Sequence, residues 1–282
     1  MSSIVKSELL EQTSLEICNV SGGVWTRPVA SCDRVVPARY LKATRIAHRV
    51  SALVLLVPAT PLIVVAMILI RATSRGPAIY KQTRVGLEGR HFQLLKLRTM
   101  THDAEAETGP VWTAIKDPRI TRLGRFLRKL HLDELPQIWN VLKGEMALIG
   151  PRPERPEFVA ELAPVIPNYV ARLAALPGVT GLSQITLPPD LTVECVRRKV
   201  TEDIRYIETA NVVLDCRILL CTALRMTGLP GGIAARLTGF RQFPSPSVGT
   251  HQCERIPGVR PAIEPHRKPA SQSRKLRKGR PR

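Results

Sequence analysis

Two adjacent carboxylates, Asp133 and Glu134, stand immediately before a short apolar segment that contains Pro136. Proline is tolerated in the first turn of a helix, so the sequence predicts a helix over residues 136–142. The N-terminus of a helix carries partial positive charge, which stabilises ionised carboxylates and attracts phosphate. An acidic pair there can bind a divalent cation through oxygen while one carboxylate attacks phosphorus. The alternative is that Asp133 only caps the helix and Glu134 is an ordinary first-turn acid.

Basic residues surround this pair along the chain. Five of them lie within 40 residues of it: Lys96, Arg98, Arg119, Arg128 and Arg152. Guanidinium groups bind phosphate oxygens bidentately, so such a set suits a diphosphate. The sequence has no P-loop, no dinucleotide-binding glycine motif, no Ser-His-Asp arrangement and no metalloprotease spacing. These residues therefore predict Mg²⁺-assisted phosphoryl chemistry at Asp133 and Glu134.

Short strands and loops are predicted to position the basic residues. A turn over residues 74–77 leads into a strand that begins at residue 78, and residues 91–100 alternate as a second strand. Residues 150–153 and 177–181 are predicted to form loops that are rich in proline and glycine.

Two helices are predicted to lie near a membrane surface. Residues 119–130 place four apolar side chains on one helical face and basic side chains elsewhere, a pattern typical of helices on anionic membranes. An ordinary packed helix with a solvated basic face is the alternative. Residues 212–226 predict a strongly apolar helix that either packs on the core or rests in the membrane interface.

Residues 50–70 contain no charged side chain and predict a membrane helix, since 21 helical residues rise about 30 Å. A buried core helix is the weaker alternative, because such helices usually carry a polar stripe. Pro58 and Pro61 each remove a helix hydrogen bond and predict a kink, and the Thr60 hydroxyl could satisfy a carbonyl freed by it. Both flanks are basic, which favours keeping both ends on the cytoplasmic side. We therefore expect a helix that enters the bilayer, bends and returns, rather than a span.

Composition limits the remaining possibilities. The chain has 282 residues and a net charge of +19, which excludes an acidic solvating protein and indicates an anionic partner. Eleven of its basic residues fall in the last 43 positions, so residues 231–282 are predicted to be a disordered basic tail that attracts anionic lipid headgroups. Six scattered cysteines form no disulfide framework or zinc site. Residues 1–44 read as a poorly ordered extension that lacks a signal peptide, and we expect the folded domain over residues 45–230.

The chain resembles the bacterial sugar transferase family, the monotopic phosphoglycosyl transferases, over residues 45–227. The resemblance rests on motifs in the family's order and spacing: Gly76-Pro77, Gln82-x-Arg84-x-Gly86, Phe92-x-x-x-Lys96-x-Arg98-x-Met100, Asp103-Ala104-Glu105, Asp117-Pro118-Arg119, Leu132-Asp133-Glu134-Leu135-Pro136-Gln137-Ile138-Trp139-Asn140-Val141-Leu142-Lys143-Gly144, Gly150-Pro151-Arg152-Pro153 and Pro177-Gly178-x-Thr180-Gly181. Thr60-Pro61 stands where the family has Ser-Pro at its membrane kink.

This resemblance implies an α/β, helix-rich, monotopic enzyme at the cytoplasmic face of the bacterial inner membrane. The enzyme would transfer a sugar-1-phosphate from a nucleoside-diphosphate sugar, such as a UDP-sugar, to polyprenyl (undecaprenyl) phosphate. That step initiates the assembly of exopolysaccharide, capsule, O-antigen or glycoprotein glycans. Asp133 would be the nucleophile, Glu134 would associate with Mg²⁺ or Mn²⁺, and the basic residues with Asp203, near Tyr206, would bind substrate. A homodimer and downstream glycosyltransferases are further implied partners.

The sequence departs from the family in two places. His131 replaces the usual serine before Leu-Asp-Glu, and the segment after Gly181 lacks the expected Asn-Gly-Arg, for which Arg197, Arg198 or Lys199 could substitute. A scaffold that lost activity through this altered loop is therefore one rival. A nucleic-acid-binding role for the tail is the other, but aromatic residues for base stacking are lacking, so no nucleic acid is expected.

Overall fold

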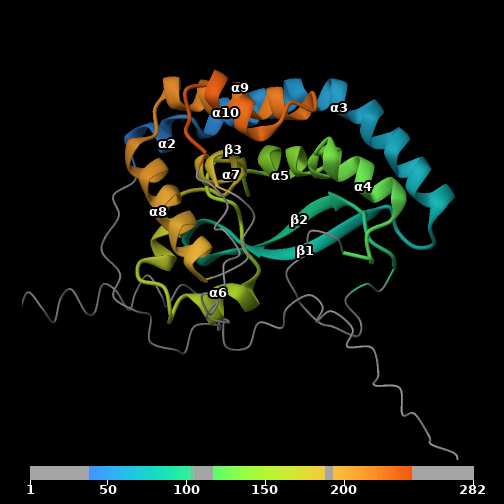
Figure 1. Cartoon of the computed structure of the whole chain (residues 1–282), viewed down its shortest axis with the longest axis horizontal. Helices are drawn as coiled ribbons and strands as arrows, with labels where there is room; N and C mark the ends of the chain where they lie inside the picture. The colour runs from blue at the N-terminus through green and yellow to red at the C-terminus, as the bar shows by residue number, and fades with distance from the viewer. Residues whose placement is uncertain (1–37, 103, 105–116, 188–192, 243–282) are drawn as a thin grey trace, which may run out of the picture.

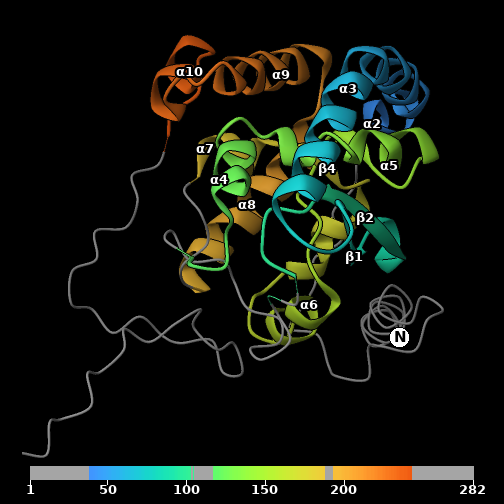
Figure 2. The same cartoon turned by 90° about the vertical axis from the view of Figure 1, so that its right-hand side faces the viewer.

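The acidic pair Asp133-Glu134 belongs to a middle layer between a helical cap and a β-hairpin. The computed structural model describes residues 38–102, 104, 117–187 and 193–242. Both views show α3 (Arg45–Thr73), α9 (Val212–Met226) and α10 (Gly231–Leu237) along the top (Figures 1 and 2). Below them lie α4 (Arg122–Lys129) and α5 (Gln137–Lys143), and the hairpin and α6 (Pro156–Leu162) lie lower still. The predicted helix-rich α/β class is confirmed.

The remaining helices connect these layers. They are α2 (Arg39–Ala43), α7 (Leu182–Thr186) and α8 (Val193–Thr209), together with the short 3₁₀ helices Leu87–Gly89, Leu132–Glu134 and Tyr169–Ala174. The predicted helices over 119–130, 136–142 and 212–226 are therefore confirmed as α4, α5 and α9, with small shifts at their ends.

Two small sheets carry the residues that face the site. Strands β1 (Ile79–Val85) and β2 (His91–Leu97) form the predicted antiparallel hairpin, with Ile79 opposite Leu97. Strands β3 (Ala147–Ile149) and β4 (Gly178–Thr180) pair in parallel, so the expectation of a loop over 177–181 is wrong for its centre. A side chain on Gly178 would collide with the backbone nitrogen of Gly150, which explains the glycine at this close approach.

Helix α3 is one continuous helix that includes both prolines. Within the described residues it is the helix long and apolar enough to cross a membrane, and only 17% of its most apolar stretch is buried. Both views show its second half leaving the direction of the first (Figures 1 and 2). The Thr60 hydroxyl donates to the Leu56 carbonyl over 2.7 Å. A proline removes the hydrogen bond to the carbonyl four residues before it, and Leu56 is not at that position for either proline. The prediction that Thr60 satisfies a carbonyl freed by the kink is therefore wrong.

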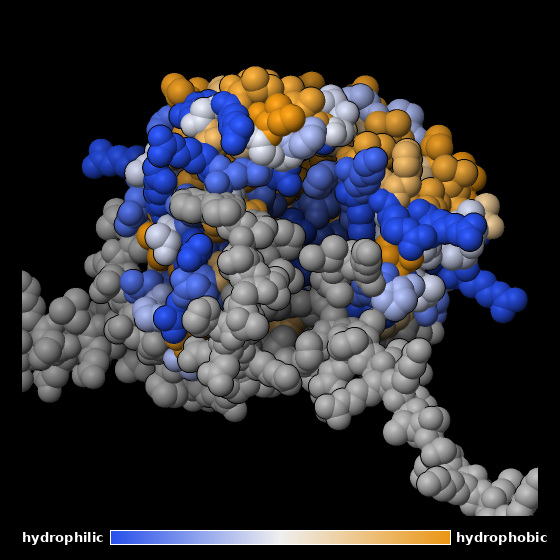
Figure 3. Space-filling model, viewed as in Figure 1, coloured by the Kyte–Doolittle hydropathy of each residue, from blue (hydrophilic) through white to orange (hydrophobic). Residues whose placement is uncertain are grey.

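Helix α9 exposes several of its apolar side chains, while it buries Asp215 together with Ile218 and Cys221. Val212, Val213 and Leu220 are more than half exposed, whereas Asp215 is 5% exposed. The Asp215 carboxylate accepts hydrogen bonds from Tyr40 of α2 and Tyr206 of α8, each at 2.9 Å. Figure 3 shows apolar residues gathered along the top of the molecule, over α9, α10 and α3. Such an arrangement fits a helix that faces lipid rather than water.

The predicted domain boundaries need correction at both ends. Residues 39–43 form α2, and residues 231–237 form α10, whose Ala234 and Ala235 are fully buried in the main core with Phe240. The ordered fold therefore extends past residue 230, because α10 covers apolar surface of α9 and α7. The rest of the predicted N-terminal extension and tail, 1–37 and 243–282, lies outside the described residues.

Candidate active site

A tight turn between α4 and α5 carries the acidic pair. His131 has a left-handed backbone (φ 55°), and the single 3₁₀ turn Leu132–Glu134 follows directly. Pro136 then precedes α5 and makes no side-chain cap. Within the described residues Asp133 accepts no hydrogen bond from the backbone amides that follow it. The capping alternative for Asp133 is therefore not supported by the geometry.

Two cations hold Glu134 in place. The Nζ atom of Lys96 lies 3.0 Å from Oε1, and Arg152 reaches Oε1 at 2.7 Å and Oε2 at 3.4 Å. Burial would raise the pKa of Glu134, but the charges of Arg152 and Lys96 outweigh it and hold that pKa far below the usual range. The pKa of Lys96 is lowered by its burial. Glu134 is thus a fixed anion at the centre of the site.

Asp133 differs electrostatically from its neighbour. Asp133 is 8% exposed, and no cation within the described residues forms an ion pair with its carboxylate. Burial, followed by the charge of Glu134, raises the pKa of Asp133, while Lys96, Arg128 and Arg152 oppose this. A buried carboxylate without hydrogen-bond donors is poorly solvated, which is a favourable state for a nucleophile.

The dyad opens onto a cavity of about 1590 Å³. Most of the predicted site residues line it together: Lys96, Arg98, Arg128, Asp133, Glu134, Arg152 and the kink residue Pro58. Arg128 donates from Nε to the Thr99 hydroxyl at 2.8 Å, and Arg98 donates to Ser74 at 2.8 and 3.0 Å. The neutral partners of both arginines leave their positive charge available for an anion in the cavity.

Two predicted substrate-binding residues do not line this cavity. Arg119 forms a bidentate ion pair with Asp117, with contacts of 2.6 and 2.9 Å. Asp203 is 1% exposed and binds Arg172 at 2.6 Å and the Ser183 hydroxyl at 2.6 Å. Asp203 does not face the cavity in this geometry, because Arg172 and Ser183 hold its carboxylate behind the site, and its direct contact with substrate stays a prediction. Tyr206 likewise binds Asp215 rather than the dyad.

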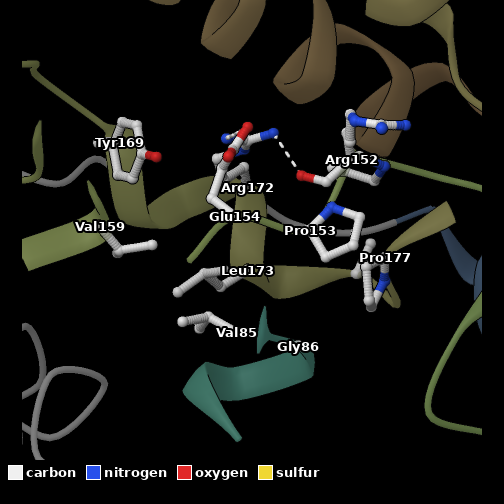
Figure 4. A pocket seen from close by; sticks show the side chains of 12 residues that line it. Val85, Gly86, Arg152, Pro153, Glu154, Val159, Tyr169, Arg172, Leu173 and Pro177 are labelled. Carbon is white, nitrogen blue, oxygen red and sulfur yellow. Dashed lines mark hydrogen bonds and ion pairs between the residues drawn. The ribbon is translucent and has the colours of Figure 1, made fainter. Parts of the chain in front are cut away.

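Arg172 connects Asp203 to the site. Its Nη2 atom donates to the backbone carbonyl of Arg152 at 2.9 Å, which is the dashed contact in Figure 4. Glu154 lies beside it and binds Lys199 at 2.7 Å and Arg172 at 3.9 Å. This buried charge network fixes the loop that carries Arg152.

Several residues that sequence reasoning did not select also line the cavity: Arg84, Glu154, Gln184 and Arg225. Arg84 lies within a family motif and Glu154 directly follows one, so the sequence could have indicated that they belong to the site. Arg225 lies in an apolar helix, where no motif indicates a functional role. Among the three proposed substitutes for the missing arginine, Lys199 lines the cavity, while Arg197 and Arg198 are exposed elsewhere on α8. Burial lowers the pKa of His131, while the charge of Glu134 opposes this.

The acidic pair offers carboxylate oxygens to the cavity. The described residues contain no cluster of three ligating side chains. Asp133 is unpaired there, and the Oε2 atom of Glu134 has only a 3.4 Å contact, so each carboxylate has an oxygen available. Mg²⁺ commonly uses one or two carboxylates and takes its remaining ligands from substrate phosphates and water. The donor set therefore fits Mg²⁺ in the presence of a diphosphate.

Comparisons with known proteins agree with this geometry. A family model for bacterial sugar transferase matches residues 39–228. A UDP-glucose:undecaprenyl-phosphate glucose-1-phosphate transferase from Caulobacter vibrioides is 42% identical over 63% of this chain and 67% of its own length. An Aeromonas hydrophila UDP-N-acetylgalactosamine-undecaprenyl-phosphate N-acetylgalactosaminephosphotransferase is 38% identical over 64% of this chain and 40% of its own length. The exopolysaccharide production protein PSS of Rhizobium leguminosarum bv. phaseoli is 35% identical over 62% of this chain and 90% of its own length.

The chain therefore belongs to the bacterial sugar transferase family. It is an enzyme of the phosphoglycosyl transferase type, and the expected resemblance is confirmed.

Proposed function

We propose that this enzyme transfers a sugar-1-phosphate from a UDP-sugar to undecaprenyl phosphate, through a covalent intermediate on Asp133. The observation that carries the proposal is the contrast within the dyad. Glu134 is held by Lys96 and Arg152, whereas Asp133 beside it is buried, unpaired among the described residues and open to the cavity. Relatives named for this reaction support the substrate classes.

In the first step an Asp133 oxygen attacks the phosphorus that bears the sugar. The bond from that phosphorus to the bridging oxygen breaks, and nucleoside monophosphate leaves with the electron pair. In the second step a phosphate oxygen of the lipid attacks the same phosphorus, and Asp133 leaves as a carboxylate. Lys96, Arg152 and Arg128 supply positive charge around the reacting phosphate. Mg²⁺ held by Asp133 and Glu134 would neutralise charge on the diphosphate.

We place α3 in the cytoplasmic leaflet as a re-entrant element, with the catalytic layer at the cytoplasmic face. The support is the exposed apolar surface of α3, its change of direction and the basic residues at both of its flanks. The outward apolar face of α9 extends the same surface. An initiating role in exopolysaccharide or capsule assembly follows the names of relatives such as PSS.

The decisive experiment separates the two halves of the reaction. Purified full-length enzyme with Mg²⁺ and a panel of nucleotide sugars, without lipid acceptor, should release about one nucleoside monophosphate per enzyme in a burst. Asp133→Asn should abolish this burst, because the amide keeps the shape but loses the attacking charge. Glu134→Gln should be severely impaired, since Lys96 and Arg152 lose their shared anion.

Glu194→Gln is the matched control, because Glu194 is an exposed first-turn acid on α8 that pairs with exposed Arg198, and neither residue lines the cavity. Its burst should match that of the wild type. An Asp133→Asn enzyme that turns over at about a tenth of the wild-type rate or faster would contradict the covalent mechanism. Mass spectrometry of the wild type after the burst should show the phosphosugar mass on the peptide that contains Asp133.

A further inference from the structure

Arg225 is a cavity cation that the mechanism above does not use. It comes from α9, and its Nη1 atom donates to the backbone carbonyl of Gln184 at 2.9 Å. Within the described residues it has no carboxylate partner, whereas Lys96 and Arg152 share Glu134, and Lys199 binds Glu154. The guanidinium of Arg225 therefore keeps its positive charge for a ligand in the cavity.

Gln184 connects Arg225 to the reacting centre. Its backbone carbonyl accepts from Arg225, and its side-chain Oε1 accepts from Arg152 Nη1 at 3.1 Å. Arg152 in turn binds Glu134. Gln184 thus links the guanidinium of Arg225 to the cluster around the dyad. Arg225 is therefore a second group that can bind phosphate, next to Arg152.

Apolar side chains surround Arg225 on its own helix. Leu219, Ala223 and Met226 of α9 line the same cavity, and Leu219 is 40% exposed. On the facing side the cavity is lined by residues of α3 that include Val54 and Pro58. Arg225 therefore stands where the apolar lining of the cavity meets its polar lining.

A ligand that fits this place has an anionic head and a long apolar chain. A nucleotide sugar has no apolar part to cover Leu219 and Met226, whereas an isoprenoid phosphate has both parts in this order. We propose that Arg225 binds the phosphate of the acceptor lipid and that the α3 and α9 lining binds its first isoprene units. This inference rests on the proposed function, since it names the acceptor subsite of the same cavity.

The first test measures both substrates in one set of variants. Full-length Arg225→Gln enzyme in detergent micelles should show a KM for undecaprenyl phosphate raised about tenfold or more, the loss expected for one charged hydrogen bond. Its KM for the nucleotide sugar should change less than about twofold. Arg225→Lys should recover part of the loss because it keeps the charge. Arg236→Gln, an exposed arginine on neighbouring α10, is the matched control and should leave both values unchanged.

The second test probes the apolar lining. Ala223→Trp places a large side chain on an exposed position of the cavity wall, so it should fold normally and hinder the chain. It should raise the KM for undecaprenyl phosphate and also for geranyl phosphate, because this two-isoprene acceptor carries the first units of the chain. Unchanged KM values for both acceptors would contradict binding of the first isoprene units at this wall.

An unchanged acceptor KM in Arg225→Gln, or an equal rise in both substrate values, would overturn the inference. These outcomes differ from failure of the proposed function, which would appear as a wild type that releases no nucleoside monophosphate with any nucleotide sugar. Inorganic phosphate provides the last distinction. It should protect Arg225 weakly from arginine-modifying reagents, whereas undecaprenyl phosphate should protect it strongly.

Discussion

Arg172 donates to the backbone carbonyl of Arg152 at 2.9 Å while the same Nη2 atom lies 2.6 Å from Asp203. Arg152 in turn binds Glu134, so a buried aspartate is linked to the dyad through two arginines. Asp203 and Arg172 are therefore positioning residues that hold the Arg152 loop, and neither contacts the cavity directly.

Arg172→Lys should lower turnover about tenfold while the protein stays folded, because a lysine keeps the charge beside Asp203 but lacks the planar fork that also reaches Arg152. The measurement is the burst rate of nucleoside monophosphate at saturating donor, with melting temperature as the fold control. A merely structural role would lower the melting temperature and leave the burst rate of the folded fraction unchanged.

Acidification should destabilise the protein through Glu154. Burial would raise the pKa of Glu154, but Lys199, Arg172 and Arg84 outweigh it and lower that pKa to about 2. A depressed native pKa stabilises the fold above the ordinary glutamate pKa, and this contribution disappears as the pH falls from about 4.5 towards 2. The wild type should lose several degrees of melting temperature more than Glu154→Gln over this interval. Parallel melting curves for the two proteins would contradict the assignment.

Gly124→Ala should destabilise the fold by about 1–3 kcal/mol. Gly124 lies in the first turn of α4, and an added Cβ would collide with the backbone carbonyl of Thr99, whose hydroxyl also holds Arg128. Arg125→Ala, on the exposed side of the same helix, should be nearly silent. Chemical denaturation of both variants in detergent provides the comparison, and equal stabilities would show that α4 can move away from Thr99.

Deletion of residues 243–282 should leave turnover intact and reduce membrane retention only slightly. An inserted α3 would dominate membrane binding, and tail charges would add about 1 kcal/mol each at most, screened by salt. Deletion of 231–282 should instead destabilise the enzyme, because it removes Ala234, Ala235 and Phe240 from the core. Detergent-extracted activity of the two truncations distinguishes these effects. A folded 243–282 deletion without activity would make the tail part of the site.

Single cysteines placed at Lys42 and Arg75, in a background without native cysteines, should both be protected from a membrane-impermeant reagent in intact cells. Both positions are exposed and lie at opposite ends of α3, so a re-entrant helix keeps them on one side. Permeabilised cells should label both, which controls for reactivity. Labelling of one position alone would establish a transmembrane span.

Local sequence signals predicted the elements and the dyad, but not the contacts between distant segments. Alternation gave the β1–β2 hairpin, and apolar runs gave α9, because each is a property of neighbouring residues. The pairing of β3 with β4 and the contact of Arg172 with Asp203 join segments about 30 residues apart. Nothing in the sequence around Arg225 indicates its bond to Gln184, since that contact arises only when α9 packs on α7.

Helix α3 is both the proposed membrane element and part of the hydrophobic core. Ala52 and Ala59 belong to the same buried cluster as Phe92 and Ile138, which lie on β2 and α5. Removing the helix to obtain a water-soluble fragment would therefore uncover the interior behind the dyad. The enzyme cannot be divided into an anchor and an independent catalyst, and any preparation that retains activity must carry its lipid-facing helix with it.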